Sequence, residues 1–120
     1  MPLKSRRRFD RIEFTVSVDV QSESLLQKFH ARNLSQGGIF LEVPGQPPPV
    51  GSHLTLSFDI PGMDKQISVK GKVMYVHRYQ SFDGSKEVSK KGIGIMFENL
   101  AEHDQMLIAT YVSGKNVSLR

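Results

Sequence analysis

Apolar and polar side chains alternate along several short segments of the chain. In residues 14–21, one phenylalanine and three valines occupy every second position, and polar residues fill the positions between them. Strict alternation rich in β-branched residues is typical of a strand with one buried face. Comparable patterns predict five more strands, at residues 26–34, 39–43, 53–60, 66–78 and 92–97.

The stretches between these strands differ in character. Residues 44–51 hold four prolines, which lack an N–H donor and restrict φ, so a loop is expected there. Residues 79–91 form a polar excursion around Asp83-Gly84. In the long segment 66–78, Tyr75 is in phase with the apolar positions, which extend from Ile67 to Val73.

Near the C-terminus the apolar period changes to that of a helix. Asn99 followed three residues later by Glu102 resembles a capping box, and Gly114 is a natural stop. Five apolar residues share one face of this helix: Leu100, Leu107, Ile108, Tyr111 and Val112. Six alternating strands with short turns favour an antiparallel barrel or sandwich, with the helix plugging an end or covering an edge.

Charge is distributed unevenly over the 120 residues. The chain carries 16 lysines and arginines, 12 acids and a formal net charge of +4. Residues 4–11 hold five cations and one acid, so this segment alone accounts for the whole excess. Residues 1–12 are polar, basic and without periodicity, which predicts an arm. Arginine predominates in it, and a guanidinium group matches phosphate oxygens and stacks on bases.

Several functional classes find no support in the sequence. There is no cysteine, which excludes disulfides and thiolate metal sites, and the four histidines are dispersed. No nucleophile elbow or phosphate-binding Walker loop appears, so an enzyme is not expected, and neither is a cofactor or a metal ion. No apolar run approaches the length of about 20 residues that spans a bilayer. We therefore expect a cytoplasmic protein without membrane insertion.

The stretch "RNLSQGGIF", residues 32–40, is a second candidate for binding. Asn33 and Ser35 carry short hydrogen-bonding side chains two residues apart, and Gly37 and Gly38 permit a ligand to approach the backbone closely. Together they could form a polar cradle for the edge of a base. The same residue types are also common in plain turns, so this stretch alone leaves both readings open.

The two stretches together resemble a known family. "RRRFDR" contains R-x-x-x-R at Arg7 and Arg11, and "NLSQGG" contains [D/N]-x-S-x-x-G at Asn33, Ser35 and Gly38. This pair, in this order and about 20 residues apart, resembles the PilZ domain, a bacterial receptor for cyclic di-GMP. "GKVMYV" and "KGIGIMFENL" resemble later strands of that domain. The resemblance implies one domain over residues 1–120: a flexible basic arm (1–12), a six-stranded antiparallel β-barrel (13–98) and a C-terminal α-helix (99–114).

The resemblance also implies how the ligand is bound. Arg7 and Arg11 would contact the phosphates and guanines, while Asn33, Ser35 and the backbone near Gly38 would contact one guanine. Further candidates are Arg6, Arg8, Gly37 and Tyr75. Many family members have aspartate where this chain has Asn33, and an amide has one acceptor where a carboxylate accepts two donors.

A signalling mechanism follows from the same resemblance. The arm would be mobile without ligand and would fold over the barrel when cyclic di-GMP binds, and a separate effector protein would receive the signal. Two alternatives stay open: a PilZ-like adaptor that binds protein and no nucleotide, and a small basic β-barrel that binds nucleic acid. The low aromatic content, 8% with no tryptophan, argues against nucleic acid.

Overall fold

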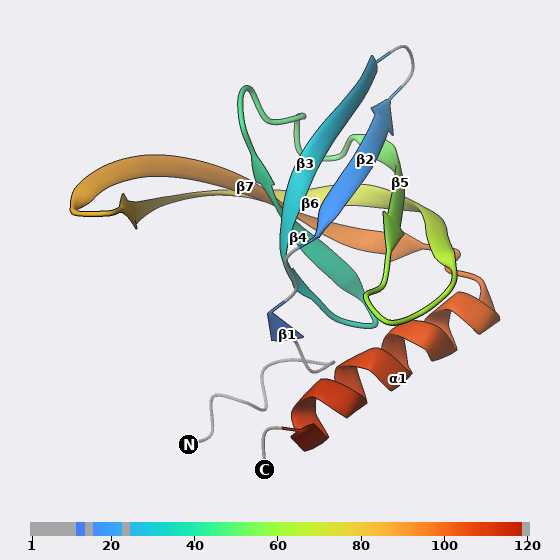
Figure 1. The fold of residues 1–120 in the computed structure, drawn as a ribbon. Coiled ribbons are helices and arrows are strands. Elements are labelled where there is room, and N and C mark those ends of the chain that lie inside the picture. Colours follow the sequence, from blue (N-terminus) through green and yellow to red (C-terminus); the bar gives the residue numbers. More distant parts are fainter. Residues whose placement is uncertain (1–11, 14–15, 23–24, 119–120) are drawn as a thin grey trace, which may run out of the picture.

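The computed structural model describes residues 12–13, 16–22 and 25–118 of the chain. They form strands and one terminal helix, in the order expected from the sequence (Figure 1). The elements are β1 (Ile12–Glu13), β2 (Ser17–Ser22), β3 (Leu25–Leu34), β4 (Gly38–Val43), β5 (His53–Asp59), β6 (Gln66–Asp83), β7 (Lys86–Glu98) and α1 (Glu102–Ser118).

The strands close into a ring of antiparallel pairs. Neighbours follow the order β3, β2, β5, β6, β7, β4, and a pairing between β3 and β4 completes the circle. The two-residue β1 pairs with the end of β3, next to the place where β2 leaves it. The predicted six-stranded antiparallel barrel with a C-terminal helix is therefore confirmed.

The alternating apolar residues fill the inside of the ring. In β2, Val18 and Val20 are buried, and in β5 every second residue from Leu54 to Phe58 is buried. The helix α1 lies below the barrel in Figure 1 and adds Ile108 and Val112 to the same core. The apolar helical face predicted from the sequence therefore packs against the barrel, while Leu107 and Tyr111 are partly buried beside it.

The polar excursion expected at residues 79–91 is instead a continuation of two strands. β6 extends to Asp83 and β7 begins at Lys86, so only Gly84 and Ser85 form the turn. Gly84 has a φ of 71°, which suits a glycine in a two-residue hairpin loop. The ribbon projects away from the barrel (Figure 1), so neither face is covered and the apolar alternation that marks a half-buried strand is missing.

The helix begins and ends at other residues than predicted. α1 begins at Glu102, where the N–H of Gln105 donates to the carbonyl of Ala101 at 2.8 Å. Asn99, the expected cap, has a φ of 53° and turns the chain between β7 and α1, a conformation that asparagine tolerates. The helix also continues past Gly114 to Ser118, since a glycine inside a helix costs only about 1 kcal/mol and does not by itself end it.

Candidate functional site

The turn between β3 and β4 is built around the hydroxyl group of Ser35. This residue is buried, and its Oγ accepts hydrogen bonds from the N–H groups of Gly37 and Gly38, each at 3.3 Å. Its own N–H donates to the carbonyl of Gly38 at 2.9 Å. Ser35 thus has a structural task, which is to fix the turn that follows Asn33. Its contact with a ligand stays a prediction.

Gly38 is required by the close approach of two backbones. A Cβ atom at this position would lie 2.1 Å from the carbonyl oxygen of Ile95 in β7. One residue earlier, the carbonyl of Gly37 accepts a hydrogen bond from the N–H of Phe97 at 3.0 Å. The glycine pair of the motif therefore ties the turn to β7, in addition to the predicted approach of a ligand.

A β-bulge in β3 brings two polar residues to the outer face of the barrel. Ala31 pairs with Leu41 and Leu34 pairs with Ile39, all four facing the core, but Asn33 pairs with Phe40 and Arg32 is the additional residue. With buried residues on both sides of them, Arg32 and Asn33 both lie toward the outside. Asn33 is half-buried there.

A second bulge, in β6, corrects the predicted phase of Tyr75. Val73 pairs with Ile95, but Tyr75 pairs with the adjacent Gly94, so Met74 is the additional residue. Tyr75 therefore leaves the phase of the core positions and lies on the outer face with 43% of its surface exposed. The alternation of the sequence does not reveal such an insertion, because one added residue reverses the faces of every residue after it.

The two bulges align one row of residues across four strands. Asn33 pairs with Phe40, Phe40 with Gly94, and Gly94 with Tyr75. With neighbouring strands about 4.8 Å apart, this cross-strand row is roughly 14 Å long. A Cβ at Gly94 would lie 2.2 Å from the ring of Tyr75, so the glycine lets that ring lie flat over β7.

Aromatic rings gather along this row, forming an aromatic cluster of Phe40, Tyr75, His77 and Tyr79. The rings of Phe40 and Tyr75 are stacked with centroids 6.3 Å apart, and those of His77 and Tyr79 are stacked at 5.6 Å. Phe40 also lies 6.3 Å from each of the latter two rings. The cluster offers flat apolar surfaces beside the polar group of Asn33, a combination suited to a planar heterocycle.

The carboxylate of Glu42 organises the charges next to the cluster. Its oxygens lie 3.0 Å from the guanidinium group of Arg32, 3.4 Å from the ammonium group of Lys90 and 3.4 Å from the hydroxyl of Tyr79. Burial, and then the negative charge of Glu42, raise the pKa of the Tyr79 hydroxyl above its ordinary 10.0, against a smaller lowering by Arg32. Two cations around one anion leave this corner of the face positive.

Sequence reasoning missed several residues of this face. Phe40 stands between the core positions Ile39 and Leu41, so its outward direction could have been inferred from alternation. Tyr79 and Lys90 lay in the stretch predicted to be a polar excursion, residues 79–91, and only the extended hairpin places them here. His77 lay in the predicted strand 66–78 but was not singled out for this face. Arg32 gave no signal, because a bulge cannot be recognised in one sequence.

The basic arm was the other half of the predicted site. Arg6, Arg7, Arg8 and Arg11 lie outside the described residues. The structure does describe β1, in which Ile12 pairs with Leu34 and Glu13 pairs with Asn33. The chain that follows the arm therefore runs directly beside Asn33.

Other kinds of site find no support in the described part of the chain. Within residues 12–13, 16–22 and 25–118, no group of three or more histidine, aspartate or glutamate side chains could hold a metal ion. The one helix in these ranges is not long and apolar enough to cross a membrane.

Comparison with known proteins identifies the fold. Solved structures that resemble the chain include the motility inhibitor MotI (DgrA) of Bacillus subtilis, with a TM-score of 0.80 and 23% identity over 96% of this chain and 53% of MotI. The PilZ domain of YcgR from Escherichia coli, solved with cyclic di-GMP, has a TM-score of 0.80 and 14% identity over 96% of this chain and 95% of the domain. The PlzA protein of Borreliella burgdorferi, also in complex with cyclic di-GMP, has a TM-score of 0.61 and 18% identity over 92% of this chain and 43% of PlzA.

Identities of 14–23% support a shared fold but carry no conclusion about a shared ligand or partner. The chain spans about half the length of MotI. A search of curated protein sequences found no match. The model of the PilZ domain family, however, matches residues 5–114, which include both sequence motifs, the whole barrel and most of the helix. The chain therefore belongs to the PilZ domain family.

Proposed function

We propose that this protein is a receptor for cyclic di-GMP and binds it between the basic arm and the cross-strand row on the outer face. One observation carries the proposal: β1 pairs with β3, so that Ile12 and Glu13 lie beside Leu34 and Asn33. Arg11 is covalently next to Ile12, and consecutive Cα atoms are about 3.8 Å apart. The last residue of the first motif thus precedes a strand that pairs beside Asn33 of the second motif, although about 20 residues separate the two motifs in the chain.

Each group at this place has a chemical counterpart in the ligand. Arg7 and Arg11, with Arg6 and Arg8 beside them, supply guanidinium groups for two phosphates. The Asn33 side chain can exchange hydrogen bonds with the edge of a guanine, and the Ser35 turn presents the backbone of Gly37 and Gly38. The outer ring of Tyr75, stacked on Phe40, offers a flat contact for a base. None of these groups performs chemistry on the ligand, which is the expected behaviour of a receptor.

The signal would be the ordering of the arm. Its four arginines repel one another, and a ligand with two negative charges removes that repulsion. A separate effector protein would then meet a different surface in the bound state. Amide hydrogen exchange of residues 4–11, which precede the paired Ile12, tests this step. Slow exchange in the unbound protein, or fast exchange at saturation, contradicts the mechanism even if the ligand binds.

Calorimetric titration with cyclic di-GMP tests the binding itself. We expect saturable binding, with no comparable heat from GTP or cyclic di-AMP. Replacing both Arg7 and Arg11 by alanine removes charge-assisted contacts of roughly 1.5–3 kcal/mol each, or about 10- to 100-fold in affinity per residue.

The matched control for this titration is Lys28→Ala. Lys28 is an exposed cation that pairs with Asp19 on β2 at 2.9 Å, away from both motifs, and its loss should leave the affinity unchanged. Wild-type protein that gives no heat with cyclic di-GMP would overturn the proposed function. Full binding by the double arginine variant would remove the arm from the site.

A further inference from the structure

The end of the β6–β7 hairpin extends beyond the barrel. β5 pairs with β6 only as far as Lys72, and β4 pairs with β7 only as far as Lys91. Beyond the pair of Arg78 and Lys91, where Lys91 also pairs with Val43 of β4, the two strands pair with each other alone, and they project sideways in Figure 1. This distal ribbon, residues 78–91, adds nothing to the buried core, which includes none of its side chains.

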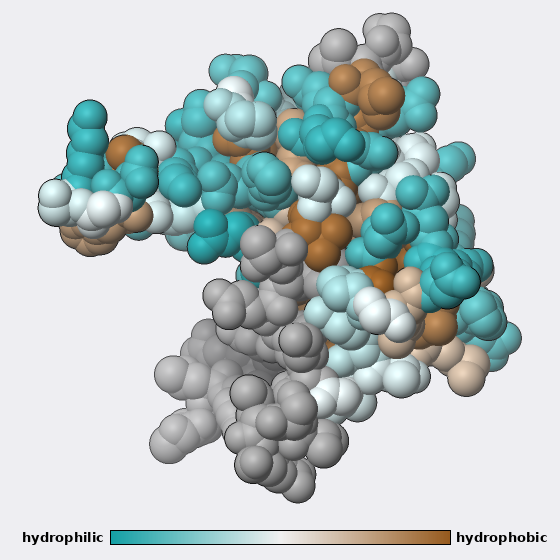
Figure 2. All heavy atoms as spheres, in the orientation of Figure 1, coloured by the Kyte–Doolittle hydropathy of each residue, from teal (hydrophilic) through white to brown (hydrophobic). Residues whose placement is uncertain are grey.

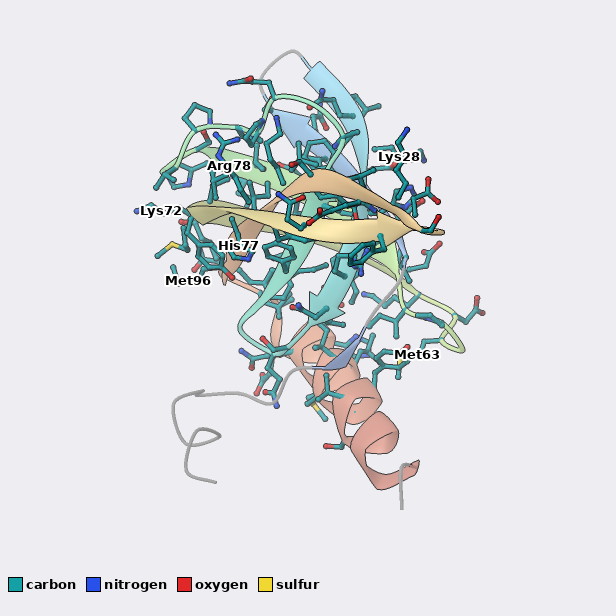
Figure 3. The ribbon with its side chains drawn as sticks, turned by 90° about the vertical axis from the view of Figure 1, so that its left-hand side faces the viewer. Lys28, Met63, Lys72, His77, Arg78 and Met96 are labelled. Carbon is teal, nitrogen blue, oxygen red and sulfur yellow. The ribbon has the colours of Figure 1, made fainter. Side chains whose placement is uncertain are left out.

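One face of the distal ribbon carries two cations directly opposite each other. Arg78 and Lys91 are cross-strand partners, an arrangement of like charges that is destabilising by itself. Neither side chain forms an ion pair within the described ranges of the chain. Figure 3 shows Arg78 and its neighbour His77 on opposite sides of the ribbon. The cation pair therefore faces away from the aromatic cluster and is open to an external anion.

The same face ends in an exposed aromatic ring. Two residues beyond Arg78, the side chains of Gln80 and Ser89 are joined by a hydrogen bond of 3.2 Å across the ribbon. Two residues further, Phe82 has 71% of its surface exposed, opposite Glu87. Figure 2 shows apolar atoms near the tip of an otherwise largely hydrophilic ribbon. At the rise of a strand, the cation pair and Phe82 are about 13 Å apart.

We propose that this face binds an extended, acidic segment of a partner protein. A carboxylate of the segment would lie between Arg78 and Lys91, and an apolar side chain four residues along the segment would cover Phe82. The spacing follows from the ribbon, because an extended peptide has the same rise per residue as a strand. Glu87 beside the ring repels an acid at that end, so the acidic residue lies at the cation pair and the apolar residue lies at the tip.

Charge distinguishes this occupant from two others. A second copy of the ribbon brings two cations and one acid on this face, so the positive charge would stay unneutralised. A polynucleotide carries phosphates along its whole length, and Glu87 near the tip of this face would repel those that lie beside it. The opposite face carries His77 and Tyr79 of the aromatic cluster, so the proposed surface backs onto the candidate ligand site without depending on cyclic di-GMP.

Selection from a random peptide library displayed on phage, with the whole protein as bait, tests the proposal. We expect enriched peptides with an aspartate or glutamate followed four residues later by a large apolar residue. Arg78→Glu with Lys91→Glu should weaken a selected synthetic peptide at least tenfold, and Phe82→Ser should weaken it as well. Lys28→Glu, which reverses an exposed cation on β3 that pairs with Asp19 of β2, is the matched control and should bind as wild type does.

Several outcomes would overturn the proposal. They are selected peptides without excess acid, peptides that bind the ribbon variants unchanged, and peptides that lose affinity equally in the control. Self-association of the wild type that the ribbon variants abolish would assign the face to a second copy, and preferential binding of a single-stranded oligonucleotide would assign it to nucleic acid. If the charge reversal unfolds the protein, Arg78→Gln with Lys91→Gln answers the same question, because it removes the cations without adding acids.

Discussion

Gly38→Ala should destabilise the empty protein strongly, for a reason that has nothing to do with ligand. The new Cβ would lie 2.1 Å from the carbonyl oxygen of Ile95 and 3.2 Å from its carbonyl carbon. The first distance is at least about 1 Å inside van der Waals contact. Both atoms belong to the backbone, so no side-chain rotation relieves the overlap. β4 and β7 must move apart where Gly38 pairs with Met96.

The magnitude can be assembled from the contacts that move. Overpacking that shifts a backbone costs about 1–3 kcal/mol. The hydrogen bond from the N–H of Phe97 to the carbonyl of Gly37 weakens, at about 1 kcal/mol, and the less flexible unfolded chain returns about 0.4–1 kcal/mol. The net loss in free energy of unfolding is therefore about 1–3.6 kcal/mol. For a domain of this size that lowers the melting temperature by roughly 3–18 °C.

Thermal and urea unfolding of the ligand-free protein measure this loss. The urea midpoint should fall with the slope unchanged, because the fold itself is the same. Gly45→Ala is the matched control: no atom lies within 4 Å of its added Cβ, and the backbone there needs no positive φ, so its stability should equal or slightly exceed that of wild type. A Gly38→Ala protein that melts within about 2 °C of wild type would refute the close approach of β4 and β7.

Three further changes probe the outer face. Gly94→Ala should rotate the Tyr75 ring away, because the new Cβ would lie 2.2 Å from it, and change its near-ultraviolet circular dichroism at a cost below about 1 kcal/mol. Glu42→Gln should lower the pKa of Tyr79 toward 10.0, so that tyrosinate absorbance appears at a lower pH than in wild type. Burial still keeps this pKa raised in the variant, so the stability of both proteins falls as the pH rises above 10.0, and it falls less in the variant. Asn33→Asp should maintain or tighten cyclic di-GMP binding in a titration and Asn33→Ala should weaken it, and a large loss in the aspartate variant would show that an amide donor is needed.

The fold could be predicted from the sequence because most strands have one buried face. Segments such as 53–60 alternate without interruption, and the residues in phase are buried as expected, from Leu54 to Ile60. The helix was recognised by its apolar face, although the local cap and stop signals at Asn99 and Gly114 were overridden. The apolar periodicity of an element is therefore a reliable predictor where tertiary packing buries one face. The local signals at Asn99 and Gly114 did not predict the ends of the helix.

The candidate site was predictable only in part, since it depends on register. The motif residues Asn33, Ser35 and Gly38 were found because their types and spacing resemble a family. Their neighbours Phe40 and Tyr79 come from other strands, and no local pattern states which strand pairs with which residue. The hairpin at Asp83-Gly84 carried a turn signal, but the absence of an apolar face concealed the strands on either side of it.

The two bulges explain how the candidate binding groups come to share this outer face. If β3 were a regular strand, Arg32 and Asn33 would face opposite sides, and one of the two would enter a core that holds only apolar groups there. If β6 were a regular strand at Met74, Tyr75 would share the inward phase of Val73 and leave Phe40 without its stacked partner. Each insertion reverses the alternation at one end of the row. Between Phe40 and Tyr75 in the row, Gly94 has no side chain that would displace the Tyr75 ring. The outer face is therefore assembled by two bulges and one glycine. The bulges turn Asn33 and Tyr75, both candidate binding residues, outward, and the glycine leaves room for the Tyr75 ring.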